Sequence, residues 1–164
     1  MKLSDYHSKI LTKSEQYREL IAFQPLLQQY PIEKIEFRYG TKTPHATVMA
    51  IRFYGVFEDF FYPFEVELIP HLSHPRVEPI AVLIEPKDFY EYSMQLCGGK
   101  PPHMYSDLDR TMICVHQRDW TERSTLGTFF MNGCIAWANN ATALVATEGL
   151  WDPDKWFTGT GGKS

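Results

Sequence analysis

Four stretches with strand-like hydrophobic patterns lie close together between residues 34 and 84, and they constrain the fold more than any other part of the sequence. Apolar and charged side chains alternate in residues 34–39, and residues 48–54, 60–69 and 80–84 are apolar enough for buried strands. Strands joined by short turns pair as an antiparallel meander, and a meander with one apolar face needs a helix to cover it. We therefore expect an α+β fold.

A helix is predicted before the meander. Thr12 and Glu15 have the spacing of a capping box, and Pro25 should kink or split the helix because proline cannot donate a backbone hydrogen bond. The apolar residues expected on one face of this helix are Tyr17, Leu20, Ile21 and Leu27.

A second, long helix is predicted from about residue 125 to residue 148, with Gly149 as its stop. Residues 126–146 contain no charged side chain, which is about the length of a membrane span. The stretch also holds asparagines and threonines, whose polar groups would need partners in hydrocarbon. We interpret it as a buried or interface helix that closes the core, and not as a membrane span.

The 164 residues suit a single domain (1–164), with a core over about residues 12–150 and a tail at 151–164. The net charge of −4 and the lack of a basic run disfavour nucleic acid as a partner. Three cysteines are too few for a disulfide framework, and the N-terminus has no apolar run that resembles a signal peptide. We expect a cytoplasmic protein. In the tail, three aromatic residues indicate a partner surface or packing on the core: Trp151, Trp156 and Phe157.

Residues 87–124 are predicted to be mostly irregular, and long irregular segments in compact domains are often functional. Cys114 lies in this segment between His103 and His116. A cysteine reacts as its thiolate, which a nearby imidazolium favours. If residues 113–116 are extended, Cys114 and His116 project to the same face. Cys134 is expected to pack in the long helix, whereas Cys97, beside two glycines, is expected to be exposed and its role is open.

Two alternatives compete with a nucleophilic Cys114. A zinc site could draw on four residues whose spacing matches no regular structural zinc site: Cys97, His103, Cys114 and His116. A cysteine hydrolase would need a distant base, for which nothing in the sequence selects among His45, His71 and His74. We expect no metal and no cofactor.

The order of elements and a short set of residues resemble the ubiquitin-conjugating enzymes. In that family a His-Pro-Asn motif stands shortly before the active-site cysteine, and a tryptophan follows it. Here Pro102-His103-Met104-Tyr105 takes the place of the motif, eleven residues before Cys114 as counted from His103, and Trp120 lies six residues after the cysteine. Ile113-Cys114-Val115 is similar to the family's Ile-Cys-Leu. The His-x-Tyr form resembles the bacterial branch of the family, whose members occur in CBASS anti-phage defence operons.

The resemblance implies an acyl carrier. Cys114 would take a protein C-terminus as a thioester from an activating enzyme and transfer it to an amine. In the bacterial systems the cargo is the C-terminus of a cGAS/DncV-like nucleotidyltransferase. This chain contains no adenylating module, so an activating partner would have to come from elsewhere. A non-catalytic protein-binding module of the same fold is the alternative function, although inactive variants normally lack the cysteine.

The sequence departs from the family at the motif's asparagine, which organises the active-site loop and steadies the oxyanion. Tyr105 stands in its place, and a phenol can donate one hydrogen bond, so Tyr105 is expected either to donate near the thioester or to pack. His103 is expected to brace the loop. A literal His74-Pro75 pair lies forty residues before Cys114 and is interpreted as structural. The candidates to assist an incoming amine are Asp107, Asp109 and Asp119.

Overall fold

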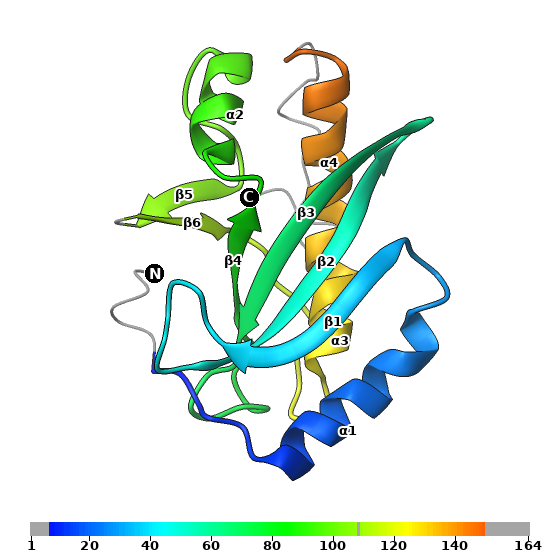
Figure 1. Ribbon diagram of the computed structural model, residues 1–164, viewed down its shortest axis with the longest axis vertical. Helices are drawn as coiled ribbons and strands as arrows, with labels where there is room; N and C mark the ends of the chain where they lie inside the picture. The colour runs from blue at the N-terminus through cyan, green and yellow to red at the C-terminus, as the bar shows by residue number, and fades with distance from the viewer. Residues whose placement is uncertain (1–6, 108, 150–164) are drawn as a thin grey trace.

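A computed structural model describes residues 7–107 and 109–149, which form an α+β fold around a six-stranded antiparallel sheet (Figure 1). The strand order is β1-β2-β3-β4-β6-β5. The strands are β1 (Ile32–Tyr39), β2 (Thr47–Phe57), β3 (Phe60–Ile69), β4 (Ile80–Glu85), β5 (Met104–Asp107) and β6 (Arg110–Ile113). The predicted meander is confirmed as β1 to β4, and the hairpin of β5 and β6 extends it beyond β4.

The first helix, α1 (Lys13–Phe23), begins as predicted. Thr12 Oγ1 accepts from the Glu15 N–H at 3.2 Å, and the Thr12 N–H donates to Glu15 Oε1 at 3.1 Å. The helix ends before Pro25, which lies in the 3₁₀ turn η2 (Gln24–Leu26).

The predicted apolar face of α1 is wrong. The four residues assigned to it are exposed, between 37% and 66%: Tyr17, Leu20, Ile21 and Leu27. The helix is instead anchored by Phe23, which is 1% exposed, and by the buried carboxylate of Glu19. A charged residue is expected to face solvent unless it is paired. The hydrophobic pattern therefore assigned Glu19 to the exposed side of the helix, although it is buried.

The prediction of an irregular segment over residues 87–124 is also wrong in large part. The segment contains the helix α2 (Phe89–Cys97) and the hairpin β5–β6. Gly98 ends α2 in a left-handed conformation, with φ of 69°. Each strand of the hairpin has only four residues, so hydrophobic alternation has little room to show in the sequence.

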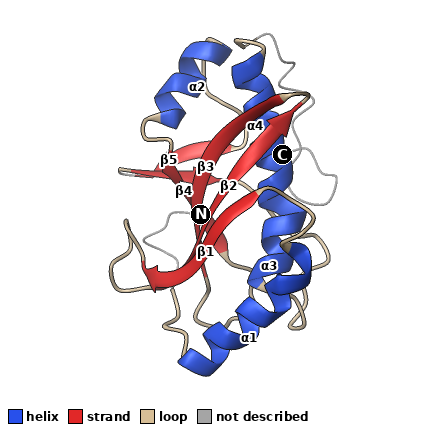
Figure 2. Cartoon of the chain, turned by 45° about the vertical axis from the view of Figure 1, so that its right-hand side comes forward, coloured by secondary structure: helices blue, strands red, loops and turns tan. Residues whose placement is uncertain are grey.

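The long C-terminal helix covers one face of the sheet, as predicted (Figure 2). It runs as α3 (Leu126–Phe129), a π-helical turn η3 (Phe130–Cys134) and α4 (Ile135–Ala146). Thr125 caps its N-terminus by accepting from the Thr128 N–H at 3.1 Å. Within the described part of the chain, no helix has both the length and the apolar character needed to cross a membrane.

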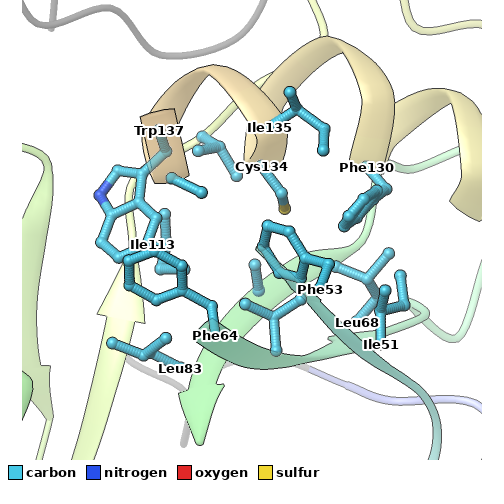
Figure 3. Packing of buried hydrophobic residues seen from close by; sticks show 14 of the residues in the cluster. Ile51, Phe53, Phe64, Leu68, Leu83, Ile113, Phe130, Cys134, Ile135 and Trp137 are labelled. Carbon is cyan, nitrogen blue, oxygen red and sulfur yellow. The ribbon is translucent and has the colours of Figure 1, made fainter. Parts of the chain in front are cut away.

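The core lies between this helix and the sheet, and phenylalanines and a tryptophan are among its largest buried side chains (Figure 3). The ring centroids of Phe53 and Phe130 lie 4.7 Å apart in an edge-to-face contact, and those of Phe64 and Trp137 lie 5.4 Å apart in the same geometry. Cys134 projects from the helix into this core and is fully buried, which confirms its predicted packing role.

The opposite face of the sheet carries a smaller apolar cluster and a charged network. The cluster consists of Ala46, Val48, Ile69, Val82 and Met112, with Ile80, Ile84 and Tyr105 packed against it. Beside it, Arg38 pairs with the buried Glu67 at 2.9 Å and with Glu65 at 3.2 Å. This face, away from the covering helix, is the one that bears the candidate site.

Candidate functional site

Cys114 follows the last residue of β6 directly, and its backbone is tied to the strand beside it. The Cys114 N–H donates to the carbonyl oxygen of His103 at 2.9 Å. The thiol is half-buried, and burial raises the pKa of Cys114 above its usual value, an effect that the positive charge of Lys100 partly offsets. The site therefore holds a protected thiol that keeps some access to solvent.

The burial of the residues on either side of Cys114 shows that its side chain lies outside the main core. Its neighbours Ile113 and Val115 both belong to the main core, and Val115 packs against Gly133, where an added Cβ would lie 3.1 Å from the valine Cβ. Cys114 itself is only half-buried and belongs to neither apolar cluster, so its side chain is directed away from that core. His116, two residues after Cys114, is exposed.

Tyr105 shares this face with Cys114. It is the cross-strand partner of Met112 and packs on the smaller apolar cluster. Burial raises the pKa of Tyr105, and the charges of Cys114 and Asp107 raise it further. The phenol therefore stays protonated near neutral pH.

His103 is buried and lies at the start of the hairpin, with a positive φ of 59°. That left-handed conformation is uncommon for a residue with a side chain, and it sets the carbonyl that receives the Cys114 N–H. The structure thus brings His103, Tyr105 and Cys114, which the sequence singled out, into one hairpin.

The segment after Cys114 is fastened to the loop between β3 and β4, which sequence reasoning missed. The two carboxylate oxygens of Glu78 separately contact His116 Nδ1 at 2.7 Å and the Gln117 N–H at 3.0 Å. Three residues further on, the Trp120 indole N–H donates to the carbonyl oxygen of Pro75 at 2.8 Å. A lone glutamate in a loop carries no sequence signal for such a contact.

That loop is itself held by a buried pair. His74 Nε2 lies 2.6 Å from Glu19 Oε1, and the other oxygen of Glu19 accepts the Leu126 N–H at 3.0 Å. Glu19 therefore links α1, the loop and the N-terminus of the long helix, where a negative charge is favoured by the helix dipole. His74 has the structural position that the sequence interpretation gave it.

Two further candidates, Cys97 and His71, have contacts of their own elsewhere in the fold. Cys97 is half-buried and packs against the main core, so its predicted exposure is wrong. His71 Nδ1 accepts the Ser73 N–H within its own loop. Across residues 7–107 and 109–149, no three or more His, Cys, Asp or Glu side chains gather closely enough to hold a metal ion. The tail aromatics Trp151, Trp156 and Phe157 lie outside the described residues.

Comparison of the chain with protein-family models, with curated proteins and with solved structures finds no match.

Proposed function

We propose that this protein is a ubiquitin-conjugating-enzyme-like acyl carrier in which Cys114 forms a thioester with a protein C-terminus and passes it to an amine. The observation that carries the proposal is the setting of Cys114. It follows a short hairpin, its N–H is held by His103, and Tyr105 lies on the same face of the sheet. The order of α1, meander, hairpin, cysteine, Trp120 and long helix supports the same proposal.

The proposed reaction has two exchanges at one carbonyl carbon. The Cys114 thiolate attacks the thioester held by an activating enzyme, and that enzyme's thiolate leaves. An amine then attacks the new thioester, the bond between carbon and the Cys114 sulfur breaks, and an amide forms. Thioesters are activated acyl donors and thiolates are good nucleophiles, so a thiol without a strongly lowered pKa suffices.

Two neighbours would support the thioester. His103 would fix the backbone at Cys114 through its carbonyl. Tyr105, as a protonated phenol on the same face, would donate to the oxyanion of the tetrahedral intermediate or pack beside it. In this proposal the cargo is the C-terminus of a cGAS/DncV-like nucleotidyltransferase, the setting is bacterial anti-phage defence in the cytoplasm, and a separate activating enzyme supplies the first thioester.

A peptide with a C-terminal mercaptoethanesulfonate thioester tests the first exchange without the activating enzyme. We expect Cys114 of the wild-type protein to take up the acyl group, giving an adduct that thiol reductants remove and that intact-mass spectrometry detects. Cys114→Ala should give no adduct, whereas Cys97→Ala, the matched control at another half-buried cysteine, should load normally. Loading of the Cys114→Ala variant at the wild-type rate would contradict the proposal.

A Tyr105→Phe variant separates the two roles of the tyrosine. Loss of an oxyanion donor typically slows acyl transfer by about 100-fold or more, whereas loss of the hydroxyl from a packing residue should leave the rate nearly unchanged. Rates of loading and of release to an amine, measured on the same peptide thioester, decide between donation and packing.

One observation favours a second candidate, a non-catalytic binding module. Burial raises the pKa of Cys114, which lowers the fraction of reactive thiolate. In a binding module, iodoacetamide would leave Cys114 of the folded protein unmodified. The acyl carrier requires that Cys114 be alkylated in the folded state.

A further inference from the structure

The contact between His116 and Glu78 stands out because both groups are accessible and His116 lies two residues from the proposed nucleophile. The His116 side chain is 67% exposed and that of Glu78 26%. Val115 between them is buried in the main core, whereas Cys114 is half-buried and His116 is exposed, so both side chains are directed away from that core. A lysine from an acceptor protein that approaches Cys114 would therefore approach His116 as well.

Glu78 fixes both the position and the tautomer of the His116 ring. One oxygen of Glu78 lies 2.7 Å from Nδ1, and the other is held by the Gln117 N–H at 3.0 Å, so the carboxylate cannot rotate freely. An ionised carboxylate only accepts hydrogen bonds, so Nδ1 must carry the proton. The unprotonated nitrogen of the neutral ring is then Nε2, which is the arrangement of a histidine that acts as a base.

Two of the three acidic candidates, Asp107 and Asp109, are less well placed. Asp107 and Asp109 lie at the turn of the hairpin, whose strand β6 runs from Arg110 to Ile113. Arg110, the cross-strand partner of Asp107, is four residues before Cys114, or roughly 14 Å at about 3.4 Å per residue, and Asp109 is one residue farther. Asp109 also pairs with Lys42 at 3.4 Å.

We propose that His116, oriented by Glu78, is the general base that takes the proton from the amine attacking the Cys114 thioester. The inference rests on the proposed function. The amine nitrogen bonds to the carbonyl carbon and gives a proton to His116 Nε2, and the bond between that carbon and the Cys114 sulfur then breaks. The electron pair leaves with the sulfur, and the proton on His116 passes to the thiolate or to solvent. His116 is thus a catalytic residue for acyl release, and Glu78 is a positioning residue.

The test uses the full-length chain loaded on Cys114 from the peptide mercaptoethanesulfonate thioester. Release is followed by mass spectrometry with two nucleophiles, the amide of Nα-acetyl-lysine and hydroxylamine. The amine of lysine is mostly protonated near neutral pH and must lose a proton, whereas hydroxylamine is mostly unprotonated and depends less on a base. The variants are His116→Gln and Glu78→Gln, and the control is Glu122→Gln, an exposed glutamate in the same loop region.

We expect His116→Gln to load like the wild type and to release to lysine at least about 100-fold more slowly, the lower end of what general-base catalysis contributes. Release to hydroxylamine should change much less. Glu78→Gln should slow release to lysine by a smaller factor, and Glu122→Gln should not. The inference would be overturned if His116→Gln released to lysine within about twofold of the wild-type rate, or if it lost the same factor with both nucleophiles. Either result would leave the proposed function standing. Failure of the wild-type protein to load would overturn the proposed function and this inference with it.

Discussion

Replacing Glu19 with alanine should destabilise the fold severely, and the size of the effect follows from its contacts. Glu19 is 8% exposed. Its carboxylate contacts the ring of His74 at 2.6 Å and accepts the Leu126 N–H at 3.0 Å. The variant leaves both groups without an acceptor, and His74 Nδ1 already lacks a hydrogen-bond partner among the described residues. A buried polar group stripped of its partner costs about 1–3 kcal/mol, so we expect a loss of about 2–6 kcal/mol. The free energy of unfolding of a whole protein is only about 5–15 kcal/mol.

Urea unfolding followed by far-ultraviolet circular dichroism measures this loss. Arg18→Ala is the matched control, because Arg18 is the exposed neighbour of Glu19 on the same helix. Glu19→Gln should fall between the two, since the amide can still accept from Leu126. Its NH₂ can meet His74 Nε2 only if the ring moves its proton to the buried Nδ1. If Glu19→Ala and Arg18→Ala differ by less than about 1 kcal/mol, the buried carboxylate does not hold the three elements together as argued.

Two further predictions concern packing and thiol reactivity. Gly55→Ala should cost at least about 2 kcal/mol in urea unfolding, because a Cβ there would collide with Thr142 Oγ1 and lie 2.5 Å from the Ala138 carbonyl oxygen; unchanged stability would show that β2 and α4 can separate at little cost. Because burial raises the pKa of Cys114, its alkylation by iodoacetamide should rise with pH through a midpoint above that of a free cysteine. The fully buried Cys134 should react only after unfolding in peptide-mapped alkylation, and reaction of both thiols in the folded state at equal rates would contradict this difference.

The parts of the fold that the sequence predicted are those set by local signals. The capping box of Thr12 and Glu15, the break at Pro25 and the meander each depend on residues close together in the chain. The prediction of an apolar face on α1 was wrong because the helix is held by the buried Glu19. The partner of Glu19, His74, is 55 residues away in the sequence. A buried charge is allowed only by its pairing, and a single sequence does not show pairing at that distance.

The candidate site divides in the same way. His103, Tyr105 and Cys114 could be singled out because they lie within twelve residues and resemble a known motif. Glu78 could not, because nothing near it in the chain marks it, and its contacts with His116 and Gln117 are made only after β3, β4 and β6 have paired.

The raised pKa of Cys114 favours a carrier over a hydrolase, and this gives a last prediction. A thiol of higher pKa is a poorer leaving group, so an acyl group on Cys114 should resist attack by water. A hydrolase needs the opposite, a thiol whose pKa is lowered by an adjacent base, whereas burial raises the pKa of Cys114. We therefore expect the peptide thioester on Cys114 to hydrolyse more slowly, at the same pH, than the thioester of the same peptide with N-acetylcysteine, with both decays followed by mass spectrometry. Faster hydrolysis on the protein would indicate that the site activates water, and the carrier proposal would then give way to a hydrolytic one.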